Sequence, residues 1–132
     1  MGPLNRYLLD TCTLIWLAAE PERLSAVARQ AIDAADSAVL LSDVSALEIA
    51  LKWTAGKIIL PDPPRQWIER QIARWELDCL GLTRQDIYRA SELPVHHRDP
   101  FDRLLVAVAI GAGATLLTPD DAIHDYPVSC RW

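Results

Sequence analysis

YLLDTCTLIW, residues 7–16, joins a short apolar run to an aspartate and then to a second apolar run. We expect residues 7–9 to form a strand, because a continuous apolar run of this length is typical of strands buried on both faces. We expect residues 11–19 to form a helix that stops before Pro21. A strand that passes directly into a helix, with Asp10 at the junction, indicates the start of a β-α-β unit.

The same alternation of short apolar runs and longer helical patterns continues along the chain. Further strands are expected at residues 38–41, 79–80, 115–117 and 128–132. Further helices are expected at residues 21–35, 45–55, 64–75, 83–93 and 100–112. This order predicts an α/β fold with three layers, α/β/α, around a mostly parallel sheet of about five strands. A length of 132 residues suits one domain over residues 1–132.

Composition and charge narrow the class of protein. Apolar residues make up 51% of the chain, which predicts a packed core rather than disorder. The net charge of −5 argues against a simple nucleic-acid-binding module, which is usually basic. The charge is compatible with an enzyme whose acidic site is neutralised by cations, and it suits a basic protein partner. No apolar run approaches the ~20 residues that span a bilayer, and no signal-peptide pattern is present, so we expect a cytoplasmic protein.

The three cysteines, Cys12, Cys79 and Cys130, are isolated and lack the C-x-x-C spacing of many zinc sites. Their odd number argues against a disulfide framework. We therefore expect buried, unreactive thiols.

Acidic residues follow the expected strands at positions that would meet at one edge of the sheet. Asp10 ends the first strand, Glu48 lies about one helical turn after the second, and Asp120 follows the fourth. Asp102 opens the helix that leads into the fourth strand. Ligand sites of open parallel sheets form at this edge. Carboxylates gathered there repel one another unless cations bind, and oxygen ligands favour Mg²⁺ or Mn²⁺ over zinc.

Each acid also has a structural explanation. Asp10, Asp99 and Asp120 each precede an expected helix, where an aspartate commonly caps the first backbone N–H groups. Ser45 and Glu48 have the spacing of a capping box. These explanations stay open for each residue alone, but they do not account for acids that gather at one edge. For Asp102 to meet the other acids, residues 93–98 must return the chain to that edge of the sheet.

Five segments, in order, resemble those of PIN-domain toxins of the VapC type: residues 7–16, 41–52, 56–61, 97–105 and 117–120. The resemblance covers nearly the whole chain. It implies a homodimeric endoribonuclease that depends on Mg²⁺ or Mn²⁺. It further implies the toxin of a type II toxin–antitoxin system, restrained in a hetero-oligomer by a cognate VapB-like antitoxin.

The resemblance also implies roles for individual residues. The positions that match the family's catalytic, metal-binding acids are Asp10, Glu48, Asp102 and Asp120. Thr118 matches a hydroxyl that supports this cluster, whereas Asp99 and Asp121 are neighbouring acids that could join it. We expect hydrolysis of an RNA phosphodiester by metal-activated water. The alternative is a catalytically silent PIN-like module that binds protein, and the sequence does not identify the RNA.

Histidines near the acids receive secondary roles, because a site of carboxylates and metal does not require one. We expect solvated or structural roles for His96, His97 and His124.

Three basic side chains lie close to the acids in the sequence. Arg98 and Arg103 flank the third acid, and each could contact phosphate or pair with an acid. Lys52 lies four residues after Glu48, which predicts an i,i+4 ion pair, with contact to RNA as the other possibility.

Overall fold

The computed structural model describes residues 5–95 and 99–132. Its strands are β1 (Asn5–Leu9), β2 (Ser37–Ser42), β3 (Asp78–Leu80), β4 (Thr115–Leu117) and β5 (Cys130–Arg131). They form one sheet in the order β3-β2-β1-β4-β5, and each neighbouring pair is parallel. The expected parallel sheet of about five strands is confirmed.

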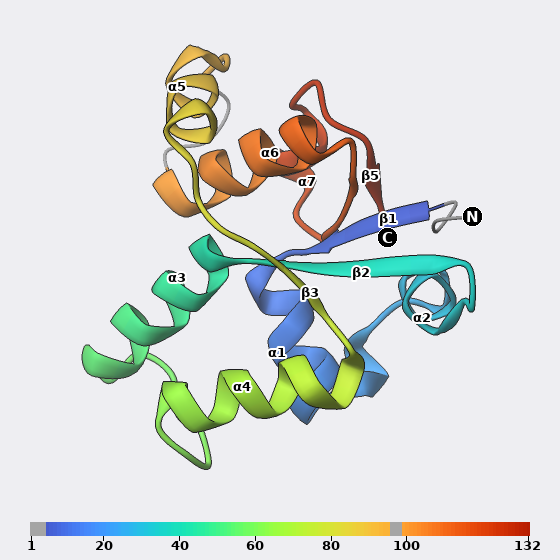
Figure 1. Cartoon of the computed structure of the whole chain (residues 1–132), viewed down its shortest axis with the longest axis vertical. Coiled ribbons are helices and arrows are strands. Elements are labelled where there is room, and N and C mark those ends of the chain that lie inside the picture. The colour runs from blue at the N-terminus through green and yellow to red at the C-terminus, as the bar shows by residue number, and fades with distance from the viewer. Residues whose placement is uncertain (1–4, 96–98) are drawn as a thin grey trace.

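Helices cover both faces of this sheet. They are α1 (Thr11–Ala19), α2 (Ala26–Asp33), α3 (Asp43–Thr54), α4 (Pro64–Trp75), α5 (Arg84–Glu92), α6 (Pro100–Ala112) and α7 (Asp121–His124), with one 3₁₀ turn, η1 (Pro21–Arg23). In Figure 1, α1, α2 and α4 lie on one side of the strands, and α5, α6 and α7 lie on the other. The expected three-layer α/β/α arrangement is confirmed. Over the described ranges, no helix is both long and apolar enough to cross a membrane.

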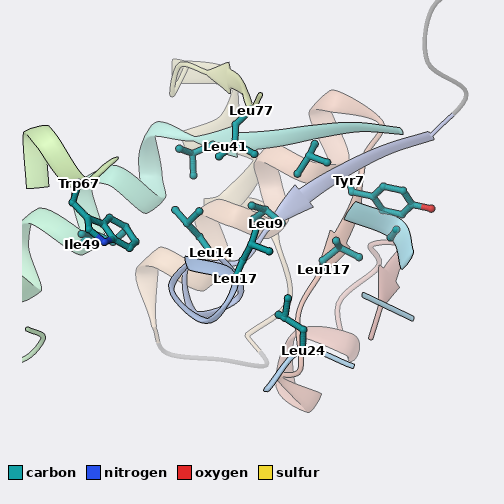
Figure 2. Packing of buried hydrophobic residues seen from close by; sticks show 12 residues of the cluster. Tyr7, Leu9, Leu14, Leu17, Leu24, Leu41, Ile49, Trp67, Leu77 and Leu117 are labelled. Carbon is teal, nitrogen blue, oxygen red and sulfur yellow. The ribbon is translucent and has the colours of Figure 1, made fainter. Parts of the chain in front are cut away.

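The central strand β1 is buried from both sides, as its continuous apolar run predicts. Tyr7 and Leu9 belong to one apolar cluster, which includes Leu14 and Leu17 of α1. Figure 2 shows Leu9, Leu14 and Leu17 close together in this cluster. Leu8 points the other way, into a second cluster formed with residues of α6 and α7. One strand therefore supports both layers of helices.

The expected single helix over residues 21–35 is wrong. Pro21 begins only a 3₁₀ turn, after which Leu24 is extended (φ −73°, ψ 140°). Ser25 then starts α2 as its N-cap, because its side chain accepts a hydrogen bond from the Ala28 N–H at 3.0 Å. This local hydrogen bond allows a new helix to begin where periodicity alone predicted a continuous one.

Two smaller expectations also need correction. The last strand covers only Cys130–Arg131 instead of residues 128–132. Of the three thiols, Cys79 is exposed and the other two are partly buried, so the expectation of buried thiols is wrong for Cys79. Cys79 lies on β3, which is an edge strand of the sheet that residues 5–95 and 99–132 form.

The parallel register brings several strand ends to the same edge. Leu9 of β1 pairs with Leu117 of β4, and Leu8 pairs with Leu40 of β2. Helix α3 continues directly from the end of β2 and contacts α4 on one side and α6 on the other. The residues that follow β1, β2 and β4, together with the first turns of α3 and α6, therefore meet in one region.

Candidate active site

Asp10 lies at the junction of β1 and α1, where it is only 5% exposed. One carboxylate oxygen, Oδ1, accepts a hydrogen bond from the Thr11 N–H at 2.7 Å and so caps the helix. The other, Oδ2, accepts from the Thr118 hydroxyl at 2.6 Å and from the Cys12 thiol at 3.7 Å. Capping therefore uses one oxygen of Asp10 and does not exclude a second role for the other.

Burial raises the pKa of Asp10, and the nearby Glu48 carboxylate raises it further. The hydrogen bonds from Thr118, Thr11 and Cys12 oppose this shift, because they stabilise the charged form. Burial and the Asp10 charge raise the pKa of Cys12 to about 12, so its thiol is a protonated donor at neutral pH. Sequence reasoning did not connect Cys12 with the acids, although its position two residues after Asp10 placed it on the same first turn of helix.

Glu48 lies on α3 and is only 4% exposed. Its Oε2 accepts a hydrogen bond from the Lys52 ammonium at 2.5 Å, which confirms the expected i,i+4 ion pair. Its Oε1 is buried and has no hydrogen-bond partner within the described part of the chain. A buried carboxylate oxygen without a partner is costly unless a ligand satisfies it.

The capping box expected for Ser45 and Glu48 is wrong. Helix α3 starts two residues earlier, because the Ser42 hydroxyl caps it by accepting from the Val44 N–H at 3.0 Å. The Ser45 hydroxyl instead accepts a hydrogen bond from the Thr11 hydroxyl at 2.9 Å. This buried contact ties α3 to the start of α1, next to Asp10. Glu48 therefore does not cap α3, and the structural explanation that was an alternative to metal binding does not apply to it.

The start of α6 brings two further acids to the same region. Asp99 caps the helix, since its Oδ1 accepts from the Phe101 N–H at 2.9 Å. Asp102 lies in the first turn and is 9% exposed. The chain after α5 therefore does return to the carboxyl edge of the sheet, which the sequence left open.

Thr118 and Asp120 complete the site from the end of β4. The buried Thr118 hydroxyl donates to Asp10 and accepts from the Asp120 N–H at 3.1 Å, so it links two of the acids. Asp120 also caps α7 through its Oδ1, which accepts from the Ala122 N–H at 2.9 Å. Asp121 is exposed and does not line the cavity described below.

One cavity of about 220 Å³ joins these acids. Its described lining is Asp10, Thr11, Cys12, Ile15, Glu48, Ile49, Lys52, Ile58, Asp99, Asp102 and Asp120. All four acids of the predicted set are present, with Asp99 as a fifth, and Lys52 is the only cationic side chain in this described lining. Across residues 5–95 and 99–132, no three His, Cys, Asp or Glu side chains already form a group ready to hold a metal ion. The acids therefore share a cavity without forming such a group.

Arg103 binds backbone carbonyls instead of pairing with an acid. Its guanidinium donates to the carbonyls of Ala90, Leu93 and Pro94 at 2.7, 3.2 and 3.0 Å. It also donates to the Tyr126 hydroxyl at 3.3 Å. These contacts fasten the end of α5 to α6, so Arg103 has a structural role and forms no ion pair with an acid among the described residues.

The predicted secondary role of His124 is structural, because its Nε2 lies 2.9 Å from the Thr118 carbonyl oxygen. His96, His97 and Arg98 lie outside the described residues.

Comparison with known proteins gives one consistent family. The PIN domain model matches residues 7–128. The chain is 35% identical over 124 residues to ribonuclease VapC22 of Mycobacterium tuberculosis, and the match covers 93% of each chain. Two solved structures have the same fold. VapBC2 of Rickettsia felis, bound to a DNA fragment from its promoter, matches with a TM-score of 0.68 and 16% identity, over 96% of this chain and 98% of that one. DNA-bound VapBC of Salmonella typhimurium matches with a TM-score of 0.67 and 18% identity, over 97% and 98%.

Proposed function

The chain belongs to the PIN domain family, and from this premise we propose that it is a metal-dependent endoribonuclease and the toxin of a VapBC-like toxin–antitoxin pair. The observation that carries the proposal is the cavity where Asp10, Glu48, Asp102 and Asp120 meet. We assign the catalytic, metal-binding role to these four acids. The 35% identity to a ribonuclease of the VapC type supports RNA as the substrate.

The donor chemistry of the cavity suits Mg²⁺ or Mn²⁺. Its polar lining is mainly carboxylate, and hard divalent cations prefer oxygen ligands. The unpartnered Oε1 of Glu48 is a buried acceptor that a cation would satisfy. Asp10, Glu48, Asp102 and Asp120 would hold the ion. When bound, it would supply an activated water nucleophile and stabilise the charge that develops on the scissile phosphate.

The chain's own residues prepare this site before any ion binds. The Thr11 N–H and the Thr118 hydroxyl fix both oxygens of Asp10 in place. The Thr11–Ser45 hydrogen bond holds α1 against α3, so that Asp10 and Glu48 keep their relative position. Such fixed geometry reduces the reorganisation needed when a charged substrate arrives.

A cognate protein antitoxin is the partner that we propose. The related folds come from VapBC complexes, and the net charge of −5 favours a basic partner segment. We place the contact on α2 and α3, where Val27, Leu47 and Leu51 are 45%, 45% and 51% exposed. Two copies of the toxin and its antitoxin would form the cytoplasmic assembly. Co-expression with the adjacent gene tests this partner, and recovery of the chain alone, with its growth toxicity unrelieved, would contradict it.

The enzymatic proposal is tested by RNA cleavage with purified chain in Mn²⁺, Mg²⁺ or EDTA. We expect cleavage with either ion, none in EDTA, and products that carry a 5′-phosphate and a 3′-hydroxyl. Asp10→Asn and Asp102→Asn should each lose at least ~10²-fold in activity, the scale of removing a key electrostatic group. Asp33→Asn, which removes the same charge from an exposed position on α2, is the matched control. Undiminished cleavage in EDTA would refute the metal mechanism, and a folded chain inactive in every condition would favour the silent protein-binding module.

A further inference from the structure

Lys52 occupies a distinctive place in the cavity. It follows Glu48 by one helical turn on α3, and its ammonium lies 2.5 Å from Glu48 Oε2. The Glu48 side chain is 5% exposed, whereas that of Lys52 is 40% exposed. The contact therefore differs from an ordinary surface ion pair, because one partner is a buried carboxylate of the acid cluster.

Lys52 brings a positive charge to a cavity whose described polar lining is mainly acidic. Five carboxylates line the cavity, and within the described lining Lys52 alone brings a positive charge to them. Glu48 depends on it most directly, since its other oxygen, Oε1, is buried without a hydrogen-bond partner among the described residues. Without Lys52, neither oxygen of this buried carboxylate would keep a hydrogen bond that the structure describes.

We propose that Lys52 is a built-in counter-ion that holds Glu48 in the metal-free protein and competes with the divalent ion for this carboxylate. The proposal rests on the function proposed above, because it concerns the same site. Lys52 satisfies Glu48 Oε2 while the metal is absent, and a bound ion takes over that neutralisation. The Lys52 side chain is 40% exposed, so its ammonium is accessible to solvent as well as to Glu48. Lys52 is thus a positioning residue whose charge lowers metal affinity.

The magnitude follows from Coulomb's law. A unit charge about 6 Å from a divalent cation in well-hydrated surroundings changes its affinity roughly tenfold. Lys52→Met should therefore bind Mn²⁺ about tenfold more tightly than wild type. The same variant should melt several degrees lower in EDTA, because Glu48 stays buried without its partner.

Lys57→Met is the matched control, since it removes the same charge from an exposed position five residues away that does not line the cavity. Thermal melts in EDTA and across a Mn²⁺ titration, with calorimetric Mn²⁺ binding, give readouts independent of activity. Lys52→Gln keeps a hydrogen-bond donor without the charge and serves where Lys52→Met does not fold. In a Glu48→Gln background, Lys52→Met should no longer lower the melting temperature in EDTA.

The outcomes separate this inference from the proposed function. Tighter Mn²⁺ binding by Lys52→Met, with Lys57→Met close to wild type, supports the counter-ion role. Mn²⁺ binding by Lys52→Met that equals or falls below that of Lys57→Met would overturn it, even where wild type responds normally to Mn²⁺. A wild-type protein that shows no Mn²⁺ binding and cleaves RNA in EDTA would overturn the proposed function, and the competition with it.

Discussion

Replacing Thr118 with valine tests whether one buried hydroxyl organises the site. The change removes the 2.6 Å hydrogen bond to Asp10 and the acceptor of the Asp120 N–H, while it preserves the shape of the side chain. A hydrogen bond to a charged group contributes about 1.5–3 kcal/mol to stability, so we expect Thr118→Val to lower the free energy of unfolding by about 2–3 kcal/mol. For a chain of this length, that is a fall in melting temperature of roughly 7–11 °C.

Thr13→Val is the matched control, because Thr13 is equally buried and its hydroxyl makes one hydrogen bond, which has no charged partner. Its hydroxyl donates to the Leu117 carbonyl at 2.8 Å, a neutral acceptor that keeps a second hydrogen bond from the Asp10 N–H. We therefore expect Thr13→Val to cost only about 1 kcal/mol, or roughly 4 °C.

The pH dependence of the Thr118→Val effect has a definite sign. The Thr118 hydrogen bond lowers the pKa of Asp10 against the larger effect of burial, so its loss raises that pKa further. The stability gap between wild type and Thr118→Val is largest where Asp10 is charged. It narrows as pH falls through the pKa of Asp10, which burial places above the ordinary value of 3.8. Thermal melts from neutral to acidic pH measure this gap. A loss no greater than that of Thr13→Val, with no pH dependence, would refute the reasoning.

Three further substitutions probe the site and its support. Asp102→Asn should leave the metal-free protein at least as stable as wild type, because one charge of the acid cluster is removed. It should also reduce the stabilisation by Mn²⁺, which for an intact site is about 2.7 kcal/mol at a hundredfold excess over Kd. Thermal melts measure both effects. A destabilised variant with an unchanged Mn²⁺ shift would show that Asp102 is not part of the site. Arg103→Met should lower the free energy of unfolding by about 2 kcal/mol, measured by urea denaturation, because the Leu93 and Pro94 carbonyls lose the donor that the structure describes for them. The Mn²⁺ shift should be unaltered. Gly113→Ala should cost about 1 kcal/mol in the same assay, because residue 113 ends α6 at a φ of 64° that only glycine adopts freely.

The sequence predicted the sheet well, because strands buried on both faces leave continuous apolar runs. The runs at β1, β2 and β4 appear where they were expected, at the centre of the sheet. The starts of helices were harder to predict. Ser25 and Ser42 each start a helix through a single side-chain hydrogen bond. The spacing of apolar residues does not reveal such a local contact.

The candidate site was predictable in its membership but not in its connections. The placement of Asp10, Glu48 and Asp120 follows from strand ends in a parallel sheet. Helix capping and a place in the site are compatible, because Asp10 and Asp120 each cap a helix with one oxygen and still line the cavity. The role of Arg103 depends on carbonyls of a separate helix, so no spacing along the sequence could have revealed it.

The hydrogen bond between Thr118 and Asp10 joins residues 108 positions apart in the chain. During synthesis, the segment that carries Asp102, Thr118 and Asp120 leaves the ribosome well after the segment that carries Asp10 and Glu48. Until it does, β1 lacks its neighbour β4 and Asp10 lacks its hydroxyl partner. An unfinished chain that holds Asp10 and Glu48 therefore has only half of the acid set. Because the cavity is lined by residues from Asp10 to Asp120, the full acid set exists only after the ribosome has made the chain as far as residue 120.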